Sequence, residues 1–202
     1  MRSLPRWIGR TASAAALLAI PAAAQETPLL PAAQYTAGTG PAALAVNDLD
    51  GDGRLDLVAA NEGGNKVSAF LGNGSGGLSS QIQSFVGPNP SSVAVGQLDG
   101  DGVPDLVASL PAEDIVTVSF GDGSGGFGAP VNFPGGDRPE WVELADLNGN
   151  GANDMVVAAR KDDALRVYFG DGLGGSWRRR CCPGTRAPVS YTHLTLPTIY
   201  SV

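Results

Sequence analysis

The chain has few of the side chains from which most enzymes build a nucleophilic active site. Its two cysteines, Cys181 and Cys182, and its single histidine, His193, all follow residue 180. The preceding residues therefore hold no Ser/His/Asp or Cys/His arrangement, and they contain no G-x-S-x-G segment. Paired carboxylates remain as a device for glycoside hydrolysis. We leave enzymatic activity undecided and favour a protein without it.

Basic residues are also scarce in the central part of the chain. Residues 25–177 contain all 20 Asp and Glu but only 6 Lys and Arg, which gives a formal charge of 6 − 20 = −14. A field of this sign repels the phosphate backbone of nucleic acids. We therefore expect no nucleic-acid partner.

Long hydrophobic runs are absent, apart from a short one near the N-terminus. Arg2, Arg6 and Arg10 precede the apolar run 14–20, and small residues follow it up to Ala24. This order is typical of a secretory signal peptide, here residues 1–24. The run is too short to cross a bilayer, which takes about 20 residues. We expect an exported protein without a transmembrane segment, located outside the cell, in the periplasm or at the cell surface.

What the chain does contain is a loop of alternating acids and glycines. It has oxygen-bearing side chains at positions 1, 3, 5 and 9, as expected of a loop that wraps Ca²⁺. Gly51 and Gly53 supply the positive φ angles that a tight loop needs. An EF-hand would carry a bidentate Glu at position 12, where this chain has Ala59. The predicted ligands are the carboxylates of Asp48, Asp50, Asp52 and Asp56 and the main-chain carbonyl of Arg54.

The loop occurs three times at a constant spacing. Its first position falls at residues 48, 97 and 146, so the period is 97 − 48 = 146 − 97 = 49 residues, which indicates a structural repeat. Asp, Asn and Gly also form ordinary turns, which is the alternative explanation for any single copy. Side-chain acids number four, three and two in the successive loops, and we expect Ca²⁺ affinity to fall in that order. The further predicted ligands are Gln97, Asp99, Asp101, Asp105 and the carbonyl of Val103 in the second loop, and Asp146, Asn148, Asn150, Asp154 and the carbonyl of Ala152 in the third.

Each 49-residue unit has the pattern of four short strands. Apolar residues alternate before and after the acidic loop, and glycine-rich links such as 72–77 are typical of hairpin turns. The 29 glycines and 15 prolines make the chain rich in turns. The prediction is an all-β fold. The expected strands of the first unit lie around Leu44 and Val46, at 56–60, around Val67 to Leu71, and at 82–85, with copies one and two periods later.

The repeats resemble FG-GAP/VCBS repeats. The resemblance rests on the D-x-D-G-D-G-x-x-D-L-V loops, the glycine-rich ends of the units and the segment Phe127-Gly128-Ala129-Pro130, and it covers about residues 30–177. It implies blades of four antiparallel strands in a β-propeller of about seven blades, similar to the integrin α-subunit head, with Ca²⁺ in the loops.

The expected domain organisation is a signal peptide, a repeat region at 25–177 and a tail at 178–202. The blades are expected at about 36–85, 86–134 and 135–177, with an additional strand at 30–35 that belongs to a blade outside the chain. Three blades make an incomplete propeller, so we interpret the chain as part of a longer one. The tail matches no part of a blade, and we interpret it as non-native sequence, the alternative being a basic tail with a redox or metal pair.

The first functional hypothesis is a secreted, calcium-binding module for adhesion to a protein or glycan ligand. Two alternatives remain open at this point. In the first alternative the repeats are the non-catalytic propeller of a larger secreted hydrolase or lyase. In the second they are structural spacers in a surface protein.

Overall fold

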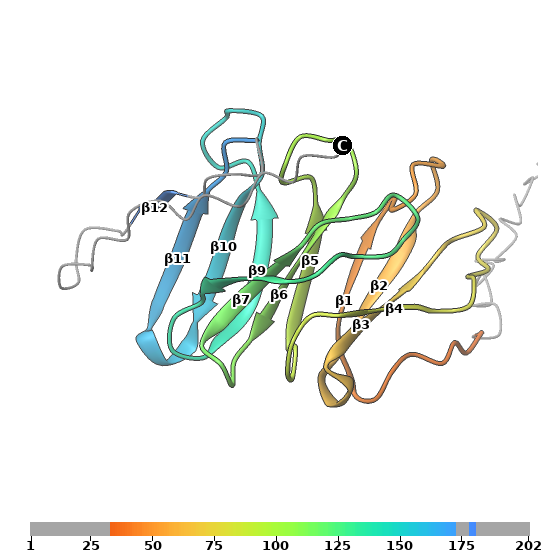
Figure 1. Cartoon of the computed structure of the whole chain (residues 1–202), viewed down its shortest axis with the longest axis horizontal. Coiled ribbons are helices and arrows are strands. Elements are labelled where there is room, and N and C mark those ends of the chain that lie inside the picture. Colours follow the sequence, from red (N-terminus) through yellow and green to blue (C-terminus); the bar gives the residue numbers. More distant parts are fainter. Residues whose placement is uncertain (1–32, 173–177, 181–202) are drawn as a thin grey trace, which may run out of the picture. The chain divides into compact units, whose positions relative to one another are not determined.

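The computed structural model describes residues 33–172 and 178–180. The expected signal peptide, both cysteines and the histidine lie outside these residues. The described residues form twelve strands in three antiparallel sheets of four strands each (Figure 1). They include no helix that is long and apolar enough to cross a membrane.

In each sheet the strands lie in chain order, so every neighbouring pair is a hairpin or a short link. The predicted all-β fold of four-stranded antiparallel blades is confirmed. The first sheet contains β1 (Pro41–Asn47), β2 (Asp56–Asn61), β3 (Lys66–Phe70) and β4 (Ile82–Phe85). The second contains β5 (Ser92–Gly96), β6 (Asp105–Leu110), β7 (Ile115–Ser119) and β8 (Val131–Pro134). The third contains β9 (Pro139–Ala145), β10 (Asp154–Ala159), β11 (Ala164–Phe169) and β12 (Arg178–Arg180), and the 3₁₀ turns η1 (Glu62–Gly64) and η2 (Arg160–Asp162) follow β2 and β10.

The hairpin between the second and third strand of each sheet turns on a left-handed residue. Asn65, Asp114 and Asp163 have φ angles of 57°, 57° and 50°. Asn and Asp tolerate this conformation better than other residues with a side chain. The three positions are one period apart, so the turn is a further element of the repeat.

The third sheet extends beyond residue 177, where the sequence pattern placed the end of the repeats. β12 pairs with β11 in the register of the earlier blades, because Val167 faces Arg180 as Val118 faces Val131 and Ala69 faces Ile82. Pairing of strands is a main-chain interaction. The alternation of apolar residues therefore gives no signal for this strand.

The strand expected at 30–35 is not present in its described part. Residues 33–40 have no strand structure up to β1, and residues 30–32 lie outside the described part. The Tyr35 ring packs edge-on against Phe70 at 6.4 Å, and its hydroxyl accepts a hydrogen bond from the amide of Leu78. From Tyr35 on, the chain contacts the first sheet through the Tyr35 ring and through the amide of Gly38, which donates to Oδ1 of Asn61 at 2.9 Å, and not through strand pairing.

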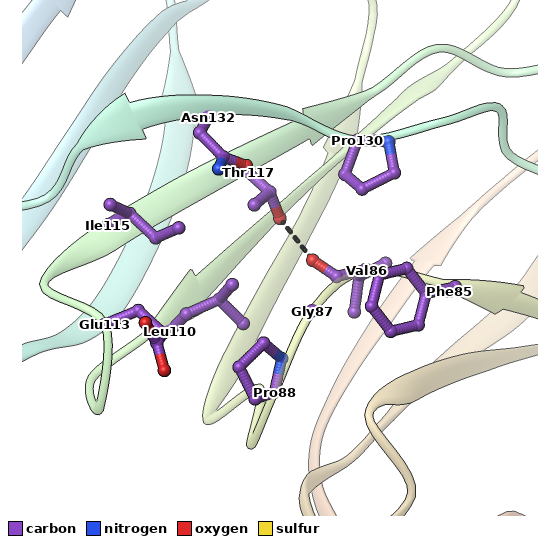
Figure 2. A pocket seen from close by; sticks show the side chains of 10 residues that line it. All are labelled: Phe85, Val86, Gly87, Pro88, Leu110, Glu113, Ile115, Thr117, Pro130 and Asn132. Atoms are coloured by element: carbon purple, nitrogen blue, oxygen red, sulfur yellow. Dashed lines mark hydrogen bonds between the residues drawn. The ribbon is translucent and has the colours of Figure 1, made fainter.

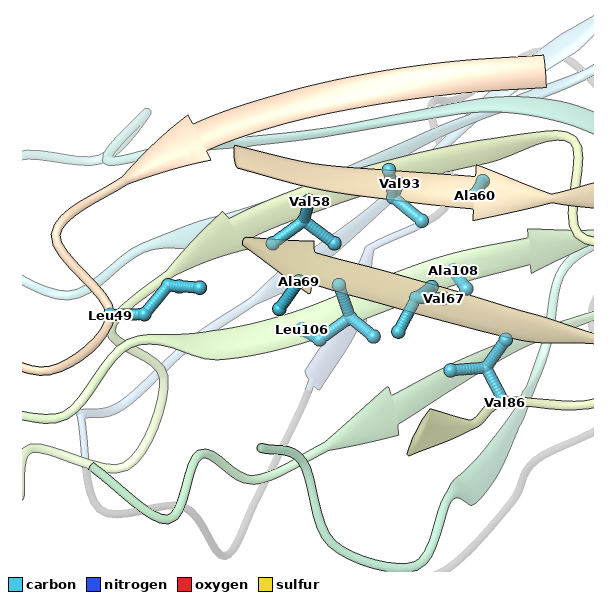
Figure 3. Close-up of a cluster of buried hydrophobic side chains, with 9 residues drawn as sticks. All are labelled: Leu49, Val58, Ala60, Val67, Ala69, Val86, Val93, Leu106 and Ala108. Carbon is cyan, nitrogen blue, oxygen red and sulfur yellow. The ribbon is translucent and has the colours of Figure 1, made fainter. Parts of the chain in front are cut away.

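Two hydrophobic cores lie between successive sheets. The first joins the first two sheets, and Figure 3 shows its nine buried side chains, among them Val58 and Val67 from the first sheet and Val93 and Leu106 from the second. The second core joins the second and third sheets in the same way, with Val116, Val142 and Met155 at less than about 2% exposure. The sheets therefore pack face to face in series, which is the packing of propeller blades.

Candidate metal centre

The three acidic loops occupy equivalent places, each between the first and second strand of a sheet. Their glycines have positive φ angles, 73° and 83° at Gly51 and Gly53 in the first loop, and the glycine pairs of the other loops do the same. The predicted conformational role of these glycines is confirmed. The loop ends are fixed by the strands on which they begin and end.

Asp48 organises the first loop through main-chain hydrogen bonds. Its Oδ1 accepts from the amides of Gly51 and Asp52 at 2.9 and 3.1 Å, and its Oδ2 accepts from Gly53 at 2.9 Å. The side chains of Asp50 and Asp52 accept from the amides two residues further on. The sequence therefore curls the loop locally, and the acidic groups gather on one side of it.

The first loop brings three of its predicted ligands together. Asp48, Asp50 and Asp56 each offer an oxygen atom that lies within 4.8 Å of the other two. Three like charges at this separation repel one another, and a divalent cation between them removes the repulsion. No second group of three acidic side chains in the described ranges is as close.

Asp52 is not part of this group. Its carboxylate forms an ion pair with the guanidinium of Arg54. Arg54 also donates from Nε to the carbonyl of Gly72 at 3.1 Å. The Arg54 side chain thus holds one predicted ligand away from the other three.

Asp56, at position 9, has a structural contact that the sequence analysis did not anticipate. It is buried, and its two oxygens accept from the amides of Leu49 and Gly72, both at 2.7 Å. A Cβ on Gly72 would overlap the carbonyl oxygen of Leu55, so the close approach requires glycine. The signal was present in the sequence as the spacing of Gly72, Gly121 and Gly170, which equals the period.

The same pair of main-chain hydrogen bonds to the position-9 aspartate, called the clasp below, recurs in the other two sheets. Asp105 accepts from Leu98 and Gly121 at 2.9 and 3.0 Å, and Asp154 accepts from Leu147 and Gly170, both at 2.9 Å. All three aspartates are at most 1% exposed. Position 9 therefore joins the acidic loop to the link between the third and fourth strand, with or without an ion.

The second loop differs because an amide replaces the first acid. Gln97 donates from Nε2 to Asp101 at 3.2 Å. Burial raises the pKa of Asp99, and the charge of Asp101 adds to that effect, whereas the amide of Val103 lowers the pKa of Asp101. Burial also raises the pKa of Asp105 to about 6.

The third loop supplies amide donors where the first has carboxylates. Asn148 donates from Nδ2 to Asp154 at 3.4 Å, and Asn150 donates from Nδ2 to the carbonyl of Gly170 at 2.9 Å. Hydrogen bonds from the amides of Gly151 and its neighbours lower the pKa of Asp146. The acids of this loop accept hydrogen bonds from protein donors. The loop also carries fewer negative charges than the first loop, so a bound cation would offset less repulsion. Binding of a cation by the main-chain carbonyls of Arg54, Val103 and Ala152 stays a prediction.

A shallow groove of about 400 Å³ lies between the first two sheets, away from the acidic loops. Figure 2 shows that Phe85, Pro88 and Pro130 line it, together with Glu113 and Asn132. The hydroxyl of Thr117 donates to the carbonyl of Val86 and is thereby occupied. Glu113 is the one ionisable side chain of the lining, so the groove offers no acid and base pair.

The first two acidic loops lie in a segment that matches a known family. Residues 48–108, from the first acidic loop to the second sheet, match the family described as FG-GAP-like repeat. No functionally curated protein matches the chain.

Two solved structures are similar to part of the chain. One is the crystal structure of TcdB2-TccC3 without its hypervariable C-terminal region (27% identity, TM-score 0.43, 56% of this chain and 6% of that chain). The other is that of TcdB2-TccC3-TEV (24% identity, TM-score 0.41, 55% of this chain and 6% of that chain). The chain thus spans only a small fraction of either protein. Residues 48–108 are thus similar to FG-GAP-like repeats, and the three sheets have a propeller-like arrangement of blades.

Proposed function

We propose that this domain is a calcium-binding module of an exported protein and that the first loop is its main metal site. The observation that carries the proposal is the approach of the Asp48, Asp50 and Asp56 carboxylates to within 4.8 Å of one another. Carboxylate oxygens are the ligands that Ca²⁺ prefers. When bound, the ion offsets two of the three negative charges and strengthens the connection of the loop to β2, on which Asp56 lies.

The charge of the repeat region supports the same proposal. A formal charge of −14 over residues 25–177 attracts divalent cations and opposes compaction of the chain. Outside the cytoplasm Ca²⁺ is abundant enough to fill sites with Kd values of about 10⁻⁴ to 10⁻³ M. The signal-peptide pattern of residues 1–24 directs the chain to that environment.

The role that follows is binding to a protein or a glycan, as in adhesion. The described residues combine metal loops with a groove that has a single ionisable side chain, and they contain no cysteine or histidine for nucleophilic catalysis. Loops fixed at the ends of a rigid sheet are suited to ligand recognition. In this proposal Ca²⁺ stiffens the first of them.

The test is the thermal unfolding of the full chain with chelator and with millimolar Ca²⁺. We expect Ca²⁺ to raise the melting temperature, since a hundredfold excess over Kd stabilises the folded state by about 2.7 kcal/mol. Asp50→Ala should abolish most of this rise, because it removes one of the three clustered carboxylates. Asn148→Ala, the same position in the third loop, is the matched control and should retain it. An unchanged melting temperature in the wild type, or equal losses in both variants, would contradict the proposal.

A further inference from the structure

The chain contains three Asn-Gly pairs, at residues 73–74, 148–149 and 150–151. Asparagine is a chemically labile residue. Before glycine it is prone to deamidation, because the main-chain amide of the glycine attacks the side-chain amide and no Cβ obstructs its approach. The rate in a folded protein depends on the hydrogen bonds of three atoms: the attacking nitrogen, the side-chain oxygen and the leaving nitrogen. The three pairs differ at these atoms.

The side-chain oxygen of Asn73 accepts three hydrogen bonds. They come from the amide and the hydroxyl of Ser75 and from the amide of Gly77, each at 2.9 Å. Donors that are fixed in this way stabilise an oxygen on which negative charge develops. The glycine-rich link 72–77 therefore polarises the side-chain carbonyl of Asn73 for attack.

The attacking and leaving nitrogens of this pair have no hydrogen-bond partner among the residues that the structure describes. Neither the amide of Gly74 nor Nδ2 of Asn73 donates to a group in residues 33–172 and 178–180. Both residues are exposed, so water reaches them. No hydrogen bond within the protein has to break before the Gly74 amide attacks.

The attacking nitrogens of the other two pairs are bonded to a carboxylate. The amides of Gly149 and Gly151 donate to Oδ1 and Oδ2 of Asp146, at 2.7 and 2.8 Å. Hydrogen bonds to a charged acceptor are stronger than those between neutral groups. Attack by either glycine amide in the third acidic loop requires one of these bonds to break.

The leaving nitrogens of these two pairs are also bonded. Nδ2 of Asn148 donates to Asp154 at 3.4 Å, and Nδ2 of Asn150 donates to the carbonyl of Gly170 at 2.9 Å. Each side-chain oxygen accepts one hydrogen bond from the described residues, from the amide two positions further on. The third loop thus holds both asparagines in place and gives their oxygens fewer donors than Asn73 has.

The equivalent link of the second sheet has an aspartate one period after Asn73. Oδ1 of Asp122 accepts from the amide and the hydroxyl of Ser124, both at 2.8 Å, and from the amide of Gly126 at 3.0 Å. These are the same three contacts as those of Asn73. The link therefore needs the acceptor oxygen and not the amide nitrogen, so an aspartate at position 73 fits it.

We propose that Asn73 is a site of spontaneous deamidation and that Asn148 and Asn150 are protected from it. The Gly74 nitrogen forms a bond to Cγ of Asn73, its proton passes through water to Nδ2, and the Cγ–Nδ2 bond breaks with release of ammonia. Water then opens the resulting succinimide ring and leaves aspartate or isoaspartate, depending on which of the two carbonyls it attacks. The reaction consumes water and releases ammonia, with no oxidation or reduction.

The two products differ in their effect on the first acidic loop. Gly72 holds this loop through its amide, which donates to Asp56, and through its carbonyl, which accepts from Arg54. Aspartate keeps the main chain unchanged, so Asn73→Asp should melt at the temperature of the wild type. Isoaspartate adds a methylene group to the main chain directly after Gly72, so the isoaspartate fraction should melt at a lower temperature.

The test is peptide mapping of the full chain by mass spectrometry after incubation with chelator at mildly alkaline pH. In the folded protein Asn73 should convert about tenfold faster than Asn148 or Asn150, or more. In denaturing urea the three rates should become similar, because each asparagine precedes a glycine and the hydrogen bonds are lost. Similar rates in the folded protein, or the same order of rates in urea, would overturn the proposal.

Two variants test the hydrogen bonds separately. Asp146→Ala removes the acceptor of both glycine amides in the third loop, so conversion in that loop should become about tenfold faster while that of Asn73 stays the same. Ser75→Ala removes one donor to Asn73 and should slow its conversion about threefold or more. Ser124→Ala, the same change in the second link, is the matched control. No acceleration by Asp146→Ala, or equal rates at Asn73 in the two serine variants, would contradict the proposal, and far-UV circular dichroism confirms that each variant is folded.

Discussion

At the scale of single residues, the position-9 aspartates have two roles that the sequence does not separate. Their spacing predicted metal ligands, and Asp56 does lie beside Asp48 and Asp50. The sequence does not predict that both oxygens of Asp56 also accept hydrogen bonds from main-chain amides, because Gly72 is distant in sequence. Nor did it predict that Arg54 withdraws Asp52 from the cluster, since ion pairing between side chains depends on their final positions.

The structural role of Asp56 predicts a stability loss that is independent of calcium. With chelator present, Asp56→Ala should lower the free energy of unfolding by about 2–5 kcal/mol, because two buried amides lose their acceptor. Asp50→Ala should cost less than about 1 kcal/mol, because the Asp50 side chain accepts its hydrogen bond from the exposed amide of Asp52. Urea unfolding measures both values. Equal losses would show that Asp56 acts only as a metal ligand.

The pKa of Asp105 predicts a pH dependence of stability without Ca²⁺. Burial raises this pKa from 3.8 to about 6, so the contribution of Asp105 is fully present below pH 3.8 and is lost as the pH rises to about 6. The difference between the two limits is about 2–3 kcal/mol. Asp105→Asn should remove the Asp105 contribution to this dependence between pH 4 and 7, as measured by urea unfolding at each pH, and leave the smaller contribution of Asp99, whose pKa is also raised. The lowered pKa values of Asp122 and Asp146 affect stability only below pH 3.8.

At the scale of strands and loops, local patterns predicted what depends on local chemistry. Alternating apolar residues and the glycine links predicted the four strands of the first two sheets. The same patterns give no signal for β12, where main-chain pairing continues without apolar residues, and they predicted a strand at residues 33–35, which have no strand structure. The left-handed residues Asn65, Asp114 and Asp163 recur at the period of the repeat, and this recurrence is a sequence signal for the turn between the second and third strands.

The close contact between the acidic loop and the third-to-fourth strand link predicts a strict need for glycine. A Cβ on Gly121 would overlap the carbonyl oxygen of Pro104, a backbone atom that cannot move without disturbing the Asp105 clasp. Gly121→Ala should therefore destabilise the protein by about 2 kcal/mol or more. Gly128→Ala, whose Cβ would lie 3.5 Å from the nearest atom, is the control and should cost less than about 1 kcal/mol. Similar melting temperatures for the two variants would contradict this interpretation.

At the scale of the whole molecule, the period of 49 residues predicted the series of equivalent sheets. It did not predict which faces remain uncovered, because Leu44 and Leu165 belong to the same apolar pattern as the buried Val93 and Val116. Burial depends on the neighbouring sheet and not on the sequence of the strand itself. The repeat is thus a reliable guide to the fold of each sheet, whereas the exposure of a strand residue depends on what packs against that sheet.

The N-terminal sequence predicts where the mature protein begins. If residues 1–24 are a signal peptide, export should remove them and leave Gln25 as the first residue. Leu18→Arg places a charge in the apolar run and should block export, because that run must enter an apolar environment during translocation. Mass spectrometry of the exported protein measures the new N-terminus, and cell fractionation measures the block. Ser3→Ala, which leaves both the arginines and the apolar run intact, is the control and should be exported and cleaved as the wild type. Recovery of the uncleaved chain from the cytoplasm, in wild type and variants alike, would contradict the assignment and would also remove the calcium-rich environment on which the proposed site depends.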